Sequence, residues 1–401
     1  MKKLALLALL GLAAIPGAYA RPEATPGVSA DRILLGGTGP LSGPEVAYAG
    51  VLAGANAYFR HVNANGGVHG RRIEYRYYDD AYDPSRTVLG TRRLVQQDQV
   101  FAIFNTVGTE QNLAIRGFLN AAKVPQLFGG TGLRRFGQER ARYPWTLNFL
   151  HSFFSEGRLY GRHIAQNRRG ARVAVIYEAS DYGRELLAGL RAGLGSKATV
   201  AAAEPHDITD TDVTSQMAQL KRSGATVLVV FALPKHTIAS FIAAHKLGWR
   251  PQTYVTSVSI DPAVMKLSRA STSSATGEGA VAIAFVKDPT NPRWAKDPIV
   301  PLYRQIMKRY LPRANADEVV HFYGMAVAHA MVDSLRRAGR NPTRAGLLRA
   351  ATHLNLKSPF MYPGIRLRTS PSDYFPIGSV QFFRFRQGRW RAFGKLVPAG
   401  N

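Results

Sequence analysis

The chain contains no cysteine among its 401 residues. This absence excludes disulfides, thiolate catalysis and cysteine-ligated metal sites. It also excludes the anchor of a bacterial lipoprotein, because that lipid is attached to an N-terminal cysteine. A chain of this composition that is exported should therefore be free of any lipid tether.

Acidic residues are scarce, with 26 Asp and Glu against 52 Lys and Arg, and the formal net charge is +26. Attraction to an anionic partner such as nucleic acid would explain the excess. A codon bias toward arginine explains it equally, and arginine here far outnumbers lysine. The basic residues form short, dispersed pairs such as Arg71-Arg72 and Arg336-Arg337. We favour codon bias and expect no nucleic-acid partner.

Only the N-terminus carries a long uninterrupted apolar run. Lys2 and Lys3 precede the apolar stretch from Leu4 to Ile15, and Ala18-Tyr19-Ala20 forms an A-x-A pattern. These features are typical of a secretory signal peptide, and the run is too short to span a bilayer comfortably. The sequence therefore predicts a signal peptide over residues 1–20, cleavage after Ala20 and a periplasmic mature protein.

Motifs of catalysis and of metal binding are also missing. There is no G-x-S-x-G elbow, no H-E-x-x-H pair and no P-loop, and the histidines are dispersed. The dinucleotide fingerprint fails because Ser42 stands where its third glycine belongs. Asp79-Asp80 is explained as a strand end and turn, since adjacent strand residues point to opposite faces. We expect neither an enzyme nor a cofactor or metal site.

Alternating strand and helix patterns fill most of the chain, whose length favours two domains. We expect strands at 33–35, 73–78, 100–104, 125–128, 172–177, 227–231 and 253–256, with helices at 50–64, 84–98, 110–122, 153–167, 181–194, 212–223 and 236–247. Such βα repeats predict parallel sheets covered by helices on both faces. The tail changes to helices at 301–311, 319–338 and 342–352 and strands at 365–368, 380–386 and 390–397. This change indicates that the chain crosses between domains more than once.

Glycines and hydroxyl side chains follow several of the expected strands. These loops are Gly39–Gly43, Val107-Gly108-Thr109 and Gly130-Thr131-Gly132. Ligands of open α/β sheets bind beyond the carboxyl ends of strands, where glycines expose backbone N–H groups and a helix N-terminus favours an anion. A helix cap is the alternative role for Thr109. Together the loops predict a ligand site.

The opening of the chain resembles the type I periplasmic binding proteins of the Leu/Ile/Val-binding kind, which serve ABC transporters. The segments that carry this resemblance are Gly39–Pro44, Gly54-Ala55, Asn63–Ile73 and Tyr78–Pro84, with Asp181-Tyr182-Gly183 and Gly277-Glu278-Gly279 further along. The resemblance covers nearly all of the chain after the predicted signal peptide.

This resemblance implies an α/β fold of two Rossmann-like lobes, joined by three crossovers, with the ligand cleft between them. The first lobe would comprise residues 31–149 and 281–362, and the second residues 150–280 and 363–398. The implied function is that of a monomeric periplasmic solute-binding component, which closes on a small molecule and delivers it to an inner-membrane ABC permease. A ligand-sensing receptor or regulator of the same fold is the alternative.

The resemblance also assigns ligand-binding residues. The ligand carboxylate would be held by Thr109 and by the loop Gly130-Thr131-Gly132, an aromatic ring would come from Tyr48, and the second lobe would contribute Tyr182. Phe104 is a further candidate for the pocket wall, with a core position as the alternative. The family's first-lobe disulfide is missing here, and Tyr82 stands at one of the cysteine positions.

One departure from the family concerns the acidic residue that holds the ligand's amine. The matching stretch, 255–260, contains Ser257 as the expected ligand contact but no acid before Asp261. A buried ammonium without a carboxylate partner is costly. We therefore expect a ligand with a carboxylate and no ammonium, namely an aromatic or aliphatic acid or an amide, rather than a branched-chain amino acid.

Overall fold

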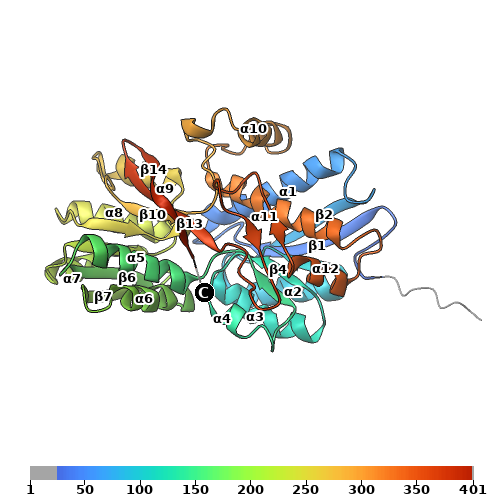
Figure 1. Ribbon diagram of the computed structural model, residues 1–401, viewed down its shortest axis with the longest axis horizontal. Coiled ribbons are helices and arrows are strands. Elements are labelled where there is room, and N and C mark those ends of the chain that lie inside the picture. Colours follow the sequence, from blue (N-terminus) through green and yellow to red (C-terminus); the bar gives the residue numbers. More distant parts are fainter. Residues whose placement is uncertain (1–24, 400–401) are drawn as a thin grey trace, which may run out of the picture.

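The computed structural model describes residues 25–399, so the predicted signal peptide at 1–20 lies outside the described residues. Two lobes lie side by side, each built around its own sheet (Figure 1). Lobe 1 is the five-stranded sheet with the helices packed on it, and lobe 2 is the seven-stranded sheet with its helices. Within residues 25–399, no helix has both the length and the apolar character needed to cross a bilayer.

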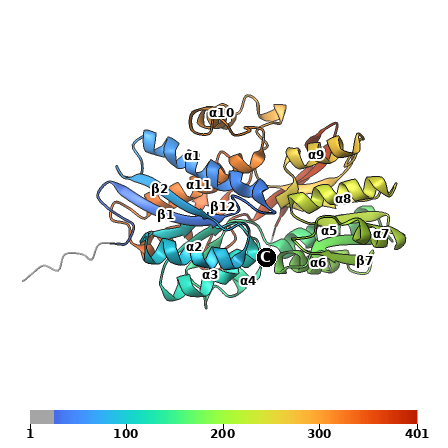
Figure 2. The same ribbon diagram turned by 180° about the vertical axis from the view of Figure 1, so that it is seen from behind.

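Lobe 1 contains a parallel sheet in the order β2-β1-β3-β4-β5. Its strands are β1 (Arg32–Gly39), β2 (Arg72–Asp79), β3 (Ala102–Phe104), β4 (Gln126–Gly129) and β5 (Thr146–Asn148). Its helices are α1 (Ala49–Ala64), α2 (Pro84–Gln96), α3 (Thr109–Ala121), α4 (Arg135–Gln138), α10 (Ile299–Tyr310), α11 (Val319–Arg337) and α12 (Arg344–Ala351). Helix α10 packs on α1 and stands at the top of both views (Figures 1 and 2).

Lobe 2 repeats this strand order and adds an antiparallel hairpin. The order is β14-β13-β10-β9-β8-β6-β7, so β7-β6-β8-β9-β10 matches the five strands of lobe 1. The strands are β6 (Arg172–Glu178), β7 (Thr199–His206), β8 (Val227–Phe231), β9 (Gln252–Val255), β10 (Val281–Ala284), β13 (Ser379–Arg386) and β14 (Arg389–Pro398). The helices are α5 (Phe153–Asn167), α6 (Asp181–Leu194), α7 (Thr214–Arg222), α8 (Pro234–Lys246) and α9 (Pro262–Thr272).

Both sheets are covered on two faces because their buried strands are apolar on both sides. In β1, Leu34 packs against α2 and α3, whereas its neighbours Ile33 and Leu35 belong to the cluster on the opposite face. In β6, Ile176 packs with α7 and α8, and Val175 lies in the cluster that holds α5 and α6. This alternation of faces along a strand produces the three-layer arrangement that the βα pattern predicted.

The chain passes between the lobes after β5, after β10 and again before β13. The boundary expected at residue 281 differs from the sheets, because β10 pairs with β9 and β13 of lobe 2 and the crossing follows Ala284. On the last return, the two-residue strands β11 (Asn355–Leu356) and β12 (Leu367–Arg368) pair with each other, and Thr369 donates to the Ala351 carbonyl of lobe 1. The second boundary at 363 is therefore also early.

Helices α5 and α6 approach closely through glycine. A Cβ atom on Gly157 would lie 2.0 Å from the Leu186 carbonyl oxygen. We expect Gly157→Ala to destabilise the protein by about 1–3 kcal/mol, because the backbone on the other side of the contact cannot give way. Gly117→Ala is the matched control: Gly117 lies within α3, where an added Cβ would meet open space, so alanine should stabilise by up to ~1 kcal/mol. Urea denaturation measures both, and equal effects would contradict the packing argument.

Candidate functional site

A cavity of about 140 Å³ lies between the lobes. Its wall includes the loops after β1, β2, β3 and β4 in lobe 1, those after β6, β8 and β9 in lobe 2, and the crossovers after β5 and β10. These are the carboxyl ends of parallel strands, where open α/β sheets place their ligands. The two equivalent strand orders therefore bring their binding edges face to face.

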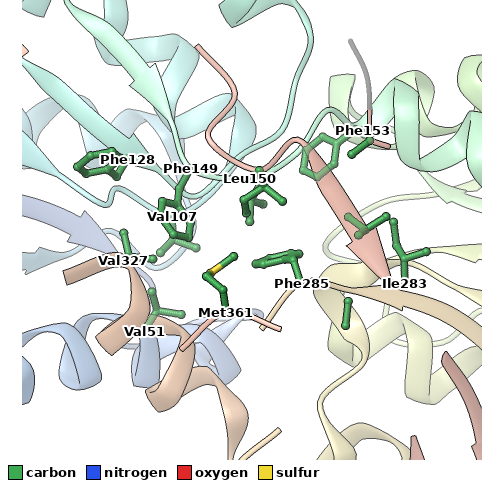
Figure 3. Close-up of a cluster of buried hydrophobic side chains, with 14 of the residues drawn as sticks. Val51, Val107, Phe128, Phe149, Leu150, Phe153, Ile283, Phe285, Val327 and Met361 are labelled. Atoms are coloured by element: carbon green, nitrogen blue, oxygen red, sulfur yellow. The ribbon is translucent and has the colours of Figure 1, made fainter. Parts of the chain in front are cut away.

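Most of the cavity surface is apolar. Val51 and Val107 contribute from lobe 1, Phe153 from lobe 2, and Leu150 and Phe285 from the crossovers between them. Figure 3 shows Leu150 and Phe285 between the two lobes, with Val107 and Val51 on one side and Phe153 on the other. An occupant of this cavity would bury apolar surface against both lobes, and that burial favours closure.

Thr109 opens α3 on the lobe 1 side of the cavity. Gly108, with φ 109°, is the N-cap, and no side chain caps the helix. The capping role considered for Thr109 is therefore wrong. Thr109 Oγ1 lies 2.8 Å from Thr131 Oγ1, which accepts from Leu133 N at 3.3 Å. If Thr131 donates to Thr109, the Thr109 hydroxyl is free to donate into the cavity.

The three residues of the loop after β4 occupy different places. Gly130 lines the cavity, whereas Thr131 is fully buried behind Thr109. Gly132 lies away from the cavity wall, and a Cβ on it would meet the His151 carbonyl oxygen at 2.0 Å. The Gly132 carbonyl also accepts a hydrogen bond from Phe153 N at 2.8 Å. Gly132 thus allows close contact with the first crossover.

Four tyrosines line the cavity: Tyr48, Tyr82, Tyr182 and Tyr323. Tyr48 donates its hydroxyl across the lobes to the Val258 carbonyl at 3.0 Å, and Tyr182 donates to Thr256 Oγ1 at 3.3 Å within lobe 2. Burial raises the pKa of both phenols, which are therefore neutral donors. Tyr82, in the turn after β2, also lines the cavity. The family resemblance had marked this position only as one where other members carry a cysteine. Its φ of 63° turns the chain at this point.

Ser257 begins the 3-10 turn η2 (Ser257–Ser259) and lines the cavity, as do Tyr48, Thr109, Gly130 and Tyr182. Its backbone N–H donates to Glu156 Oε1 at 2.6 Å and its hydroxyl to Glu156 Oε2 at 2.7 Å. His151 Nε2 lies 3.0 Å from the same Oε2. His151 lies in the first crossover and Glu156 at the start of α5, and both are fully buried. Sequence reasoning missed both.

Asp261, the first acid after Ser257, also lines the cavity, but both its oxygens are engaged. Oδ1 accepts from Ala263 N at 2.9 Å and Oδ2 from Val319 N at 2.7 Å. The second contact joins α9 of lobe 2 to α11 of lobe 1. Burial, with the nearby Asp288 carboxylate, raises the pKa of Asp261 to about 6.

The outer end of the cavity is formed by the crossover after β10 and by the hairpin. Lys287 is paired with Asp297 at 2.7 Å, and Asp288 accepts from Thr290 N at 2.8 Å. Trp294 and Trp390 complete this end. No motif marked these residues in the sequence. Phe104, by contrast, is buried between Phe59 and Tyr75, which confirms the core interpretation.

Further hydrogen bonds hold the lobes together in a closed arrangement. Glu110 Oε1 of α3 accepts from Asp181 N of α6 at 2.8 Å, and Glu185 Oε2 accepts from Arg134 N at 2.7 Å. Glu45, in the loop after β1, is fully buried, and neither of its carboxylate oxygens has a hydrogen-bond partner in the described structure.

A protein-family model described as a periplasmic binding protein matches residues 32–389, which is most of the chain. The chain belongs to the periplasmic binding protein family. This family is not one of enzymes, which agrees with the missing catalytic motifs. The two-lobed α/β fold expected from the sequence is confirmed by the same match and by the sheets described above.

Known members and structures are similar to this periplasmic binding protein over nearly its whole length. The Leu/Ile/Val-binding protein homolog 2 of Brucella abortus is 26% identical, over 83% of this chain and 85% of the relative. The structure of a branched chain amino acid ABC transporter from Thermus thermophilus with bound valine has a TM-score of 0.81 at 16% identity and covers 92% of this chain and 96% of that one. A solute binding protein from R. palustris in complex with 4-hydroxybenzoate has a TM-score of 0.76 at 16% identity, covering 92% and 97%.

These findings confirm the resemblance seen in the opening segments of the sequence. The chain is a periplasmic binding protein, and it is similar to Leu/Ile/Val-binding protein homologues and to structures of ABC-transporter binding proteins. The solved structures share the fold at low sequence identity and differ in the ligands they hold. The identity of the ligand must therefore be argued from the residues of this cavity.

Proposed function

We propose that the protein captures a small carboxylate without an ammonium group, an aromatic or aliphatic acid or an amide, and delivers it from the periplasm to an inner-membrane ABC permease. The observation that carries this proposal is the pairing of two unlike walls. The lobe 1 wall offers the Thr109 hydroxyl and the uncapped N-terminus of α3, which favour an anion. On the facing lobe 2 wall, both carboxylate oxygens of Asp261 already accept hydrogen bonds from backbone N–H groups.

Two acids near the lobe 2 wall, Glu156 and Asp261, support this choice because their oxygens already accept hydrogen bonds from protein groups. The carboxylate of Glu156 is hydrogen-bonded to Ser257 and His151. That of Asp261 accepts from backbone N–H groups at the N-termini of α9 and α11. An α-ammonium placed among Phe153, Leu233 and Phe285 would lose its water without gaining a carboxylate. An aromatic or aliphatic body would lose nothing there.

Binding acts through closure of the two lobes. Tyr48 and Asp261 make hydrogen bonds from one lobe to the other in the closed arrangement, and a ligand that touches both walls adds to them. Such a ligand shifts the population of open and closed forms toward the closed one. Export with removal of residues 1–20 would place this monomeric receptor in the periplasm.

A thermal-shift screen of the mature protein tests the ligand class. The acids are benzoate, 4-hydroxybenzoate, hexanoate and 6-hydroxyhexanoate, and the amino acids are leucine, isoleucine and valine. A ligand at about a hundredfold its Kd should add roughly 2.7 kcal/mol of stability. We expect a shift with at least one acid and none with the amino acids. A shift confined to the amino acids would contradict the proposal.

A further inference from the structure

The hydroxyl hydrogen of Ser257 is committed to the protein interior. Glu156 receives three donors: the backbone N–H of Ser257 at 2.6 Å, the Ser257 hydroxyl at 2.7 Å and the His151 ring nitrogen at 3.0 Å. In the bond between the two side chains, the Ser257 hydroxyl is the donor and Glu156 Oε2 is the acceptor. Glu156, which lies in α5, and His151, which lies in the first crossover, are both fully buried.

A serine hydroxyl has one hydrogen and two lone pairs. With its hydrogen given to Glu156, Ser257 Oγ presents only acceptor capacity to the cavity that it lines. The neighbouring polar groups are committed as well: Tyr182 donates to Thr256 Oγ1, and Tyr48 donates to the Val258 carbonyl. The lobe 2 wall around η2 therefore lacks a free donor from these groups and has an acceptor at Ser257.

We propose that Ser257 selects ligands that carry a neutral O–H or N–H donor in addition to the carboxylate, and that Glu156 is the positioning residue that makes Ser257 an acceptor. This inference rests on the proposed function, because it places the ligand's carboxylate at the Thr109 wall and its donor at the opposite wall. Hydroxy acids and acids with an amide N–H meet both requirements. A single neutral oxygen cannot compensate the charge of an ammonium group.

Matched pairs of acids test the inference by calorimetry. Benzoate is compared with 4-hydroxybenzoate and hexanoate with 6-hydroxyhexanoate, and 4-methoxybenzoate serves as a substituent that accepts but does not donate. In the wild type, we expect the hydroxylated member of the pair that fits to bind about three- to tenfold more tightly than its parent. In Ser257→Ala, this ratio should fall to about one.

Two further variants separate the role of Ser257 from general damage. Ser259→Ala is the matched control, because Ser259 lies in the same turn, donates to the Ala232 carbonyl at 2.8 Å and is not part of the cavity wall. It should keep the wild-type ratio. In Glu156→Gln, the amide can donate to Ser257 Oγ and free its hydrogen. The preference should then shift from 4-hydroxybenzoate toward 4-methoxybenzoate, which a merely structural role of Glu156 would not cause.

The outcomes are distinct. If an acid binds but its hydroxylated partner binds no better, or if the preference persists in Ser257→Ala, the inference is overturned while the proposed function stands. If none of the acids binds and the amino acids do, the proposed function fails, and this inference fails with it.

Discussion

Replacing Thr109 with valine should weaken the binding of a carboxylate ligand by about 10- to 100-fold. Valine keeps the shape of threonine but removes the hydroxyl that faces the cavity at the start of α3. A hydrogen bond to a charged group contributes about 1.5–3 kcal/mol, which corresponds to this loss of affinity. Calorimetry with the acid that binds the wild type gives the change in Kd directly.

Two controls make this result specific. Thr109→Ser keeps the hydroxyl and should stay within a few fold of the wild type. Thr91→Val makes the same chemical change in a fully buried threonine whose hydroxyl has no hydrogen-bond partner in the described structure and which is not part of the cavity wall. Its affinity should be unchanged. If Thr109→Val bound the acid as the wild type does, the carboxylate would not lie at the N-terminus of α3.

The predictable part of the site follows from local sequence. Helices α5 and α6 and strand β8 have the bounds that their patterns predicted, because each is long or wholly apolar between clear caps. Ser152 and Ser180, for example, cap α5 and α6 through their side chains. Thr109 could be placed near a ligand since it follows a strand of a parallel sheet, and such strands end at one edge.

Other parts of the fold depend on contacts between distant segments. Strand β7 was not predicted, because the residues of Thr199–His206 are mostly half-exposed and carry no strong apolar alternation. Strand β10 was assigned to the wrong lobe, because its place is set by pairing with β13, about a hundred residues later. The four apolar residues of β10 would suit either sheet.

The site residues that the sequence did not predict also depend on contacts between distant segments. Glu156 meets Ser257 only through the packing of α5 against the end of β9, so no spacing in the sequence links them. Trp294 and Trp390 reach the cavity from a crossover and from a hairpin whose residues show no ligand-binding motif. Sequence patterns identify which strand ends carry polar residues, whereas the crossovers that complete the cavity are set by the tertiary fold.

The affinity for the ligand should fall as pH rises from about 5 to about 8. In the arrangement described here, Glu45 of lobe 1 is fully buried and is acted on by the carboxylate of Glu178 of lobe 2. Burial, together with the Glu178 carboxylate, raises the pKa of Glu45 to about 8, while Lys235 acts in the opposite direction. Burial likewise raises the pKa of Glu178 to about 7, with Glu110 and Asp207 adding to the rise and Ser180 opposing it.

In the open form, the Glu45 carboxylate would meet water and return to its ordinary pKa of 4.5. The closed form therefore binds a proton that the open form releases. The stabilisation of the closed form by this proton is complete below about pH 4.5 and is lost above about pH 8. Between these values, the ligand affinity declines by up to about tenfold per pH unit. The acids of the screen are fully ionised over most of this window, so their own titration contributes little.

Glu45→Gln tests the assignment, because glutamine is neutral at every pH and has nearly the same shape. Between pH 6 and 8, we expect the wild-type affinity to fall at least about tenfold and the variant to fall much less, with tighter binding than the wild type at pH 8. Some pH dependence of the affinity should persist in the variant, because the pKa values of Glu178 and Asp261 are also raised in the closed form. An unchanged pH profile in Glu45→Gln would mean that the carboxylate stays ionised in the closed form. Closure would then leave Glu45 hydrated, and the lobes of the ligand-bound protein would lie further apart at this edge than they do here.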